Sequence, residues 1–196
     1  MAVAIFDYGV GNIFSLRAAF SREGVESLVT ADMGSVREAD ALVLPGVGGF
    51  ASASSALPKE EIRRLAGEGK PLIGICLGLQ LFFEESEEGP GAGLGLFPGK
   101  VRRLPPRVKV PHMGWNTVTV RKRDAITDGV ADGSWVYYAH SYHPPEVGDG
   151  LVATTDYGVE YPALVRRKNV VGLQFHPEKS GAAGRRILRN ILKELV

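Results

Sequence analysis

The first ninety residues alternate short apolar runs with amphipathic stretches. Apolar runs predict buried strands at 3–6, 28–30, 41–44 and 72–75. Apolar residues at helical spacing predict helices at 13–20 and 59–68, and a third that begins near Leu79 and ends in the acidic run 84–88. Strands and helices that alternate with short connections require right-handed crossovers. We therefore predict a mostly parallel sheet flanked by helices.

The rest of the chain carries strand patterns with no long helix between them. Apolar runs predict strands at 117–120, 135–139, 152–155, 164–165 and 170–175, and one apolar face predicts a final helix around 187–195. Such a series favours antiparallel strands that extend the parallel sheet at one edge. No internal repeat is visible, and no linker is long or polar enough to separate two domains. We predict one α/β domain over 1–196.

Composition narrows the class of protein. The 196 residues hold 23 Lys and Arg against 22 Asp and Glu, a net charge of +1, so nothing favours nucleic acid or anionic membrane as a partner. One cysteine makes no internal disulfide, which fits a reducing compartment. No apolar run approaches the roughly 20 residues of a membrane span, and no signal peptide is visible. We expect a soluble, cytoplasmic protein.

The single cysteine, Cys76, lies at the predicted turn from strand 72–75 into a helix. Gly74 and Gly78 flank it two residues away on each side. This is the arrangement of a nucleophile elbow with cysteine in place of serine. The glycines allow a sharp turn, and N–H groups at a helix N-terminus favour thiolate over thiol. A buried, inert cysteine remains the alternative for this segment alone.

A glycine-rich loop follows the strand 41–44. Residues 45–50 read PGVGGF, and in them Val47 lies between Gly46 and Gly48. Because ligands collect at the carboxyl edge of a parallel sheet, this loop should lie near Cys76. Successive backbone N–H groups of such a loop stabilise a developing oxyanion. An ordinary flexible loop is the alternative.

The last predicted strand leads into His176, Pro177 and Glu178. In an extended segment, residues two apart face the same side, so the imidazole and the carboxylate lie together. A carboxylate beside an imidazole sets its tautomer and stabilises the imidazolium. A surface turn is the alternative for this segment alone. With Cys76, the segment supplies nucleophile, base and orienter, each at the end of a predicted strand.

Three segments together, 45–48, 74–80 and 176–178, give the chain its resemblance to the triad (class I) glutamine amidotransferases. Segments 7–12, 111–116 and 140–142 are similar to those of the glutaminase subunits of histidine biosynthesis. The resemblance implies a flavodoxin-like fold and hydrolysis of glutamine to glutamate and ammonia, without metal or cofactor. It also implies a heterodimer in which ammonia passes to a cyclase subunit, a (β/α)₈ barrel that makes imidazole glycerol phosphate.

The resemblance also implies a role for each site residue. Cys76 is the nucleophile, His176 the acid and base, and Glu178 its orienter. The oxyanion donors are the backbone N–H of Leu77 and one from Val47 or Gly48. The amino-acid end of glutamine is held by Gln80 and by the backbone around Ser141 and Tyr142.

We expect the partner to dock at the sheet edge near Cys76. The contact residues expected there are Asn12, Met113, Trp115 and Lys179. Trp115 is the expected anchor because aromatic residues often dominate interfaces, although a core position for it remains open. A peptide unit at Val47 that rotates its N–H toward or away from the oxyanion would let the partner switch activity.

Two alternatives stay open. One is another class I glutaminase subunit, of the pyridoxal phosphate or anthranilate pathway. The segment 111–116 argues against it. The other is a catalytically silent protein on the same scaffold.

Overall fold

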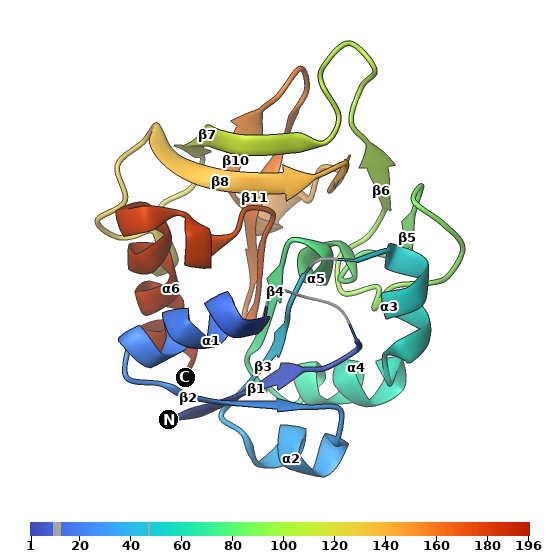
Figure 1. The fold of residues 1–196 in the computed structure, drawn as a ribbon, viewed down its shortest axis with the longest axis vertical. Helices are drawn as coiled ribbons and strands as arrows, with labels where there is room; N and C mark the ends of the chain where they lie inside the picture. The colour runs from blue at the N-terminus through green and yellow to red at the C-terminus, as the bar shows by residue number, and fades with distance from the viewer. Residues whose placement is uncertain (10–12, 47) are drawn as a thin grey trace.

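We describe a computed structural model of the chain that covers residues 1–9, 13–46 and 48–196 (Figure 1). Asn12 and Val47, which the sequence analysis singles out, lie outside the described residues. In the described ranges, no helix is long and apolar enough to span a membrane. The same ranges hold no group of three or more His, Cys, Asp or Glu residues arranged to bind a metal ion.

The N-terminal part alternates strands and helices as predicted. Its elements are β1 (Ala2–Phe6), α1 (Ile13–Arg22), β2 (Glu26–Thr30), α2 (Met33–Glu38), β3 (Ala41–Leu44), α3 (Phe50–Ala56), α4 (Lys59–Gly67) and β4 (Leu72–Ile75). The four strands and the two longer helices confirm the sequence-based expectations. The short helices α2 and α3 have too few turns for their periodicity to be recognised in the sequence.

The segment after β4 differs from the prediction. The helix α5 (Leu77–Gln80) ends after four residues and does not continue through Phe83. Backbone N–H groups of Leu94, Gly95 and Leu96 donate to the carbonyls of 81–83, which a continuing helix would have used for itself. The predicted helix end at 84–88 is also wrong: β5 (Glu85–Ser86) pairs in parallel with β6 (Lys100–Arg103).

The C-terminal part is antiparallel, as predicted. Its strands are β7 (His112–Val120), β8 (Ser134–His140), β9 (Tyr142–His143), β10 (Leu151–Asp156), β11 (Glu160–Arg167) and β12 (Val170–Leu173). The helical elements among and after them are the 3₁₀ turns η1 (Ala125–Thr127), η2 (Gly148–Gly150) and η3 (Pro177–Lys179), and the last helix α6 (Gly181–Leu195).

One sheet joins both parts in the order β2-β1-β3-β4-β12-β11-β10-β7-β8. The strands from β2 to β12 in that order are parallel, and the rest are antiparallel. Strands β5, β6 and β9 form a small second sheet. Figure 1 shows the β7–β8 hairpin above the parallel half, as the predicted extension at one edge.

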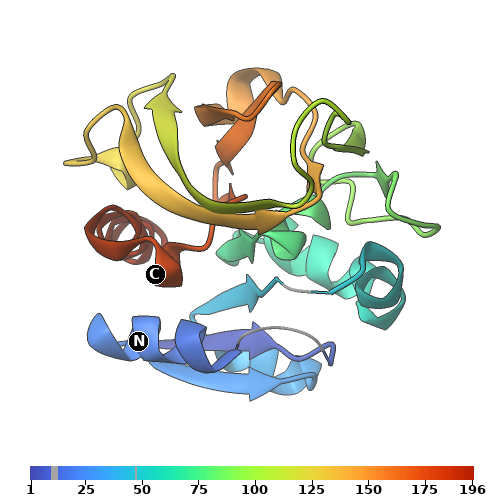
Figure 2. The same ribbon diagram turned by 45° about the horizontal axis from the view of Figure 1, so that its top comes forward.

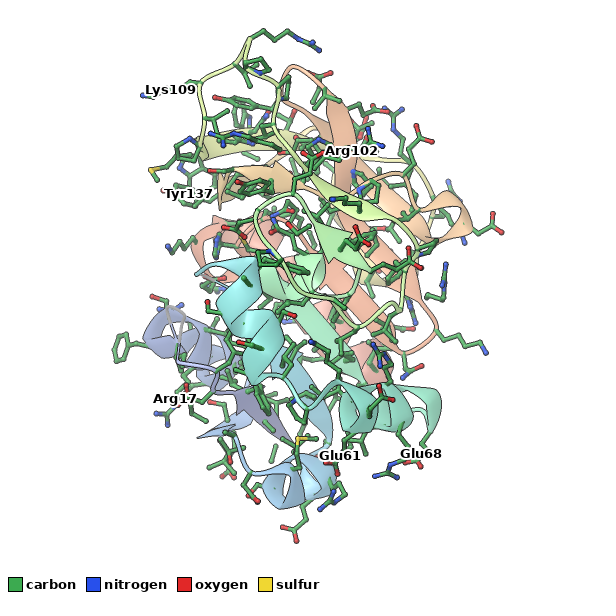
Figure 3. The ribbon with its side chains drawn as sticks, turned by 90° about the vertical axis from the view of Figure 1, so that its right-hand side faces the viewer. Arg17, Glu61, Glu68, Arg102, Lys109 and Tyr137 are labelled. Atoms are coloured by element: carbon green, nitrogen blue, oxygen red, sulfur yellow. The ribbon has the colours of Figure 1, made fainter. Side chains whose placement is uncertain are left out.

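Helices cover both faces of the parallel half (Figures 1 and 2). On one face α1 and α6 lie side by side, joined by the ion pair of Arg189 with Glu23. The other face carries α2, α3 and α4, and Glu68, which caps α4, is labelled at the lower right in Figure 3. Val3 and Ile5 of β1 enter one core and Ala4 and Phe6 the other, which is the two-residue period of a strand buried on both faces.

This order determines where the chemistry gathers. β3, β4 and β12 are adjacent parallel strands, so their carboxyl ends meet at one edge. Gly46 follows β3, Cys76 follows β4 and His176 follows β12. Parallel α/β sheets bind ligands at this carboxyl edge, so a ligand site is expected here.

Candidate active site

Cys76 joins β4 directly to α5 in a rare backbone conformation. Its φ is 53° and its ψ −104°, a region that side chains other than glycine seldom enter. The backbone N–H of Cys76 donates to the carbonyl of Leu173 at 2.7 Å, which ties the turn to the end of β12. Such strain persists only where the surroundings enforce it, and it is concentrated at functional sites. The predicted elbow is therefore present, and its sharp turn is made at the cysteine itself.

The glycines around the elbow serve close packing, where we expected them to supply the turn. A Cβ on Gly78 would lie 2.0 Å from the carbonyl oxygen of Leu44, and one on Gly74 would lie 2.6 Å from the ring of Phe82. A Cβ on Gly46 would lie 1.9 Å from the Ile75 carbonyl oxygen. Backbone of the β3 loop thus rests directly on backbone of the elbow, a distance that no side chain permits.

His176 and Glu178 form a buried pair. The Nδ1 of His176 and Oε1 of Glu178 are 2.9 Å apart, and the two side chains are 2% and 3% exposed. Their adjacency was predicted, but the reason was wrong. β12 ends at Leu173, and residues 177–179 form the 3₁₀ turn η3, with Pro177 at its start. The turn, and no extended strand, brings the carboxylate back to the imidazole.

The charge state of His176 follows from its neighbours. Burial lowers its pKa, but the Cys76 and Glu178 side chains outweigh burial and raise the pKa to about 10. At neutral pH the imidazolium is therefore favoured, with Nδ1 donating to Glu178. Since Nδ1 is taken by Glu178, the interaction with Cys76 that raises the pKa falls to Nε2, which has no well-aligned hydrogen bond within the described part of the chain.

The expected oxyanion donors are partly visible. The N–H of Leu77 belongs to the first turn of α5, where N–H groups have no partner within the helix. It faces the loop after β3, since a Cβ on Gly46 would come within 2.5 Å of it. Gly48 has a φ of 133°, in the region that favours glycine. Val47 lies outside the described residues.

A cavity of about 220 Å³ opens beside Cys76. It brings together the predicted residues Leu77, Gly48, Gln80, Ser141 and Tyr142. The remaining lining residues are Gly46, Glu88, Pro111, Met113, Ala139 and His140. Sequence reasoning missed Glu88, because nothing in the run 84–88 separates one glutamate from its neighbours.

A chain of side-chain amides leads from this cavity to the sulfur. The Nε2 of Gln80 donates to the carbonyl of Tyr142 at 2.8 Å and to Oε1 of Gln174 at 3.1 Å. The Nε2 of Gln174 donates to Sγ of Cys76 at 3.6 Å. The sulfur also lies 3.8 Å from the carbonyl of Ala139 in β8. Gln174 was given no role by sequence reasoning, although a polar residue within the apolar run 170–175 is a usable signal.

Two buried histidines are neutral: His140, which lines the cavity, and His112, which is linked to it through Tyr161. Burial lowers the pKa of His112 to about 4, and burial together with His112 lowers that of His140 to about 3. The hydrogen bonds assign the tautomers, because Nδ1 of His140 faces the carbonyl of Tyr142 at 2.8 Å and must donate. Nε2 of His140 then accepts from the hydroxyl of Tyr161 at 3.0 Å, and that oxygen accepts from Nδ1 of His112 at 2.8 Å. In this series each group donates to the next, from His112 through Tyr161 and His140 to the Tyr142 carbonyl.

The predicted partner residues occupy the rim of the cavity and the surface beside it. Met113 and Trp115 of β7 are 66% and 53% exposed, so the core alternative for Trp115 is wrong. The Nζ of Lys179 lies 5.6 Å from the ring centroid of Tyr137, which packs edge-on against Trp115. Tyr137 is labelled at the left in the upper half of Figure 3. Asn12 is outside the described residues.

Comparisons with known proteins agree with this geometry. The family model described as glutamine amidotransferase class-I matches residues 4–195. The subunit named imidazole glycerol phosphate synthase subunit HisH of Bacillus cytotoxicus is 48% identical over 193 residues, 96% of this chain and 92% of the relative. The protein of the same name from Methanothermobacter thermautotrophicus is 47% identical, over 97% of this chain and 98% of the relative.

Solved structures share the fold. A crystal structure described as glutamine amidotransferase superposes with a TM-score of 0.78 at 21% identity, over 98% of both chains. A chain of PurLQS from Thermotoga maritima gives a TM-score of 0.78 at 21% identity, over 100% of this chain and 99% of that one.

Proposed function

The chain belongs to the class I glutamine amidotransferases, and from this premise we propose that it is the glutaminase subunit of an imidazole glycerol phosphate synthase. The observation that carries the catalytic part is the buried His176–Glu178 pair next to Cys76. Cys76 itself lines the cavity. Near-complete coverage by relatives of that name at 44–48% identity favours this subunit over the pyridoxal phosphate and anthranilate alternatives.

The reaction uses groups of this chain and water. The Cys76 thiolate attacks the side-chain amide carbon of glutamine and gives a tetrahedral oxyanion. The His176 imidazolium donates its Nε2 proton to the departing nitrogen, so ammonia leaves and a thioester remains. The now neutral imidazole takes a proton from water, which attacks the thioester. Glutamate is released and the thiolate is restored.

Stabilisation of the oxyanion is assigned to backbone N–H groups. Leu77 supplies one from the first turn of α5. The second comes from the loop of Val47 and Gly48. Each such donor contributes about 10²–10³ in rate. The proposal that a partner reorients the Val47 peptide, and so switches the enzyme, stays a prediction.

Binding of the amino-acid end of glutamine is assigned to the cavity wall. The Glu88 carboxylate lines the cavity and is the natural acceptor for an α-ammonium group, with one oxygen already held by the backbone N–H of Phe50 at 2.8 Å. Gln80 and the backbone at Ser141 and Tyr142 complete the wall.

Ammonia would pass to a cyclase subunit with a (β/α)₈ barrel, in a cytoplasmic heterodimer. We place that partner over the rim formed by Met113, Trp115 and Lys179, together with Asn12. Support comes from the exposed aromatic and sulfur-containing side chains beside the cavity, since such residues are enriched at interfaces.

The test is glutamate release from glutamine by the purified chain, with and without a candidate cyclase and its nucleotide ligand. We expect release that depends on Cys76 and rises when the cyclase is added. Absence of glutamine hydrolysis under both conditions, in a folded protein, would contradict the proposal. Hydrolysis that other amidotransferase partners stimulate and the cyclase does not would move the chain to another pathway.

A further inference from the structure

We propose that Gln174 is a further catalytic residue, whose side-chain amide holds the Cys76 sulfur by an N–H···S hydrogen bond, and that Gln80 is a positioning residue that orients that amide. This proposal rests on the proposed function, because it assigns a new part of the same active site.

Burial makes this contact significant. Gln174 is 0% exposed, and its backbone N–H is already bonded to the Ala163 carbonyl at 2.9 Å. A side-chain amide without hydrogen-bond partners destabilises a protein when it is buried in such a place. Its amide has two protein partners, Gln80 on the oxygen and Cys76 on the nitrogen, at 3.1 and 3.6 Å. The fold therefore keeps an amide against the sulfur where an apolar side chain would fill the space.

The Tyr142 carbonyl fixes the orientation of the Gln174 amide through Gln80. The carbonyl of Tyr142 only accepts, so the group of Gln80 that faces it at 2.8 Å must be the nitrogen. The same nitrogen then requires an acceptor from Gln174, which turns the oxygen of Gln174 toward Gln80. Only the nitrogen of Gln174 is left to face the sulfur. Flipping the Gln174 amide would set donor against donor, and flipping the Gln80 amide would set its oxygen against two acceptor oxygens.

A donor aimed at the sulfur favours the thiolate, because hydrogen bonds to charged acceptors are about twice as strong as neutral ones. The titratable groups near the sulfur act differently from the Gln174 amide. His176 carries charge next to Cys76, while Tyr8 and Tyr161 are neutral because burial, reinforced by Cys76, raises the pKa of each. The cavity adds neutral His140 and the Glu88 carboxylate. Gln174 does not titrate, so its N–H faces the sulfur as a donor at every pH.

Alkylation of the chain by iodoacetamide tests the inference, since Cys76 is the only cysteine and only thiolate reacts. The rate is measured against pH by mass spectrometry for wild type and for Gln174→Met, which keeps the length and removes the donor. We expect the midpoint of the profile to move up by about one pH unit, from the usual strength of a hydrogen bond to a charged group. We also expect kcat for glutamine to fall about tenfold with KM little changed.

Two further variants make the result specific. Gln80→Met frees the Gln174 amide to rotate while Gln174 itself stays, so the midpoint should move in the same direction by less. Asn190→Leu is the matched control, because Asn190 is another buried amide, bonded to the carbonyls of Ile126 and Asp128. It should lower the free energy of unfolding and leave the midpoint of Cys76 unchanged.

The outcomes separate the possibilities. A Gln174→Met profile that superimposes on wild type overturns the proposal, and so does a control that shifts as much as Gln174→Met. If Gln174→Met does not fold, Gln80→Met decides, with a shift supporting the proposal and no shift overturning it. The alkylation profile needs no glutaminase activity, so a chain that fails to hydrolyse glutamine but shows these shifts disproves the proposed function alone.

Discussion

At the scale of single residues, the site concentrates unfavourable states that only the surroundings maintain. Cys76 holds a rare backbone conformation, and His176 is charged although it is buried. The sequence predicted both residues from their positions at strand ends. It could not predict the conformation of Cys76 or the amide of Gln174 at its sulfur, because these depend on contacts between residues 63 or more positions apart.

Two replacements of Cys76 distinguish its backbone strain from its role as the nucleophile. Cys76→Ala and Cys76→Gly should both abolish glutamine hydrolysis. Glycine has no Cβ and adopts a φ of 53° without steric cost, whereas alanine does not. The free energy of unfolding of Cys76→Gly should therefore be about 1 kcal/mol larger than that of Cys76→Ala. Urea denaturation of the two variants measures this difference. Equal stabilities would mean that the elbow is not strained, and activity in either variant would remove Cys76 as nucleophile.

Glu178→Gln should change how stability depends on pH. Since the folded pKa of His176 is raised from 6.5 to about 10, its contribution is complete below about pH 6.5 and is lost as pH rises toward 10. The variant lacks one cause of the raised pKa, so its free energy of unfolding should fall less steeply across that window. Its turnover should also slow, because the amide does not stabilise the imidazolium. Parallel stability curves for wild type and variant would contradict this account.

At the scale of elements, regular strands were predictable and their ends were not. The positions of most strands and the change from parallel to antiparallel follow from local apolar runs and connection lengths, whereas the order of the strands in the sheet was not predicted. The early end of α5 follows from carbonyls taken by a loop at 94–96, and the His176–Glu178 contact follows from a 3₁₀ turn. Neither leaves a local pattern in the sequence, because the competing partner is distant or the turn is too short.

The packing of the β3 loop on the elbow gives a prediction at this scale. Gly46→Ala would place a Cβ 1.9 Å from the Ile75 carbonyl oxygen, so backbone must move at Leu77, a proposed oxyanion donor. We expect glutaminase activity to fall at least tenfold, and a destabilisation of about 1–3 kcal/mol, as for overpacked cores.

Gly67 is the matched control for this change. It lies in α4, has no positive φ, and a Cβ there would meet nothing within 4 Å. Gly67→Ala should therefore stabilise the protein by about 0.5–1 kcal/mol and leave activity unchanged. Thermal unfolding and glutamate release are measured for both variants. Full activity in Gly46→Ala would show that the loop and the elbow move independently.

At the scale of the whole molecule, the cavity opens at the junction of the parallel half and the β7–β8 hairpin. Cys76 belongs to the first and Ala139 to the second, and the two meet across 3.8 Å. The segment 111–116, read in the sequence as a mark of one pathway, forms the beginning of this hairpin, with Met113 at the cavity. A partner on the hairpin would therefore stand over the outlet for ammonia.

Trp115→Ala should weaken binding of the cyclase by about 2 kcal/mol or more, the range of an aromatic hot spot. Since Trp115 is 53% exposed, the free energy of unfolding should change little. Trp135→Ala is the comparison, because Trp135 is 60% exposed and lies further along the same hairpin. Titration calorimetry with the cyclase gives both values. Equal losses, or none, would place the interface elsewhere.

The series of hydrogen bonds through His112, Tyr161 and His140 provides histidine signals that NMR can observe separately. The ring N–H protons of His112 and His140 are buried and bonded, so they exchange slowly with water and should give separate downfield signals. Their ring nitrogens should also report fixed tautomers down to about pH 5, since both pKa values are lowered to about 4 or below. His112 adjoins Met113 at the proposed docking rim, whereas His140 lines the cavity of Cys76. The two resonances therefore form a pair of native probes, one for arrival of a partner and one for its effect on the nucleophile.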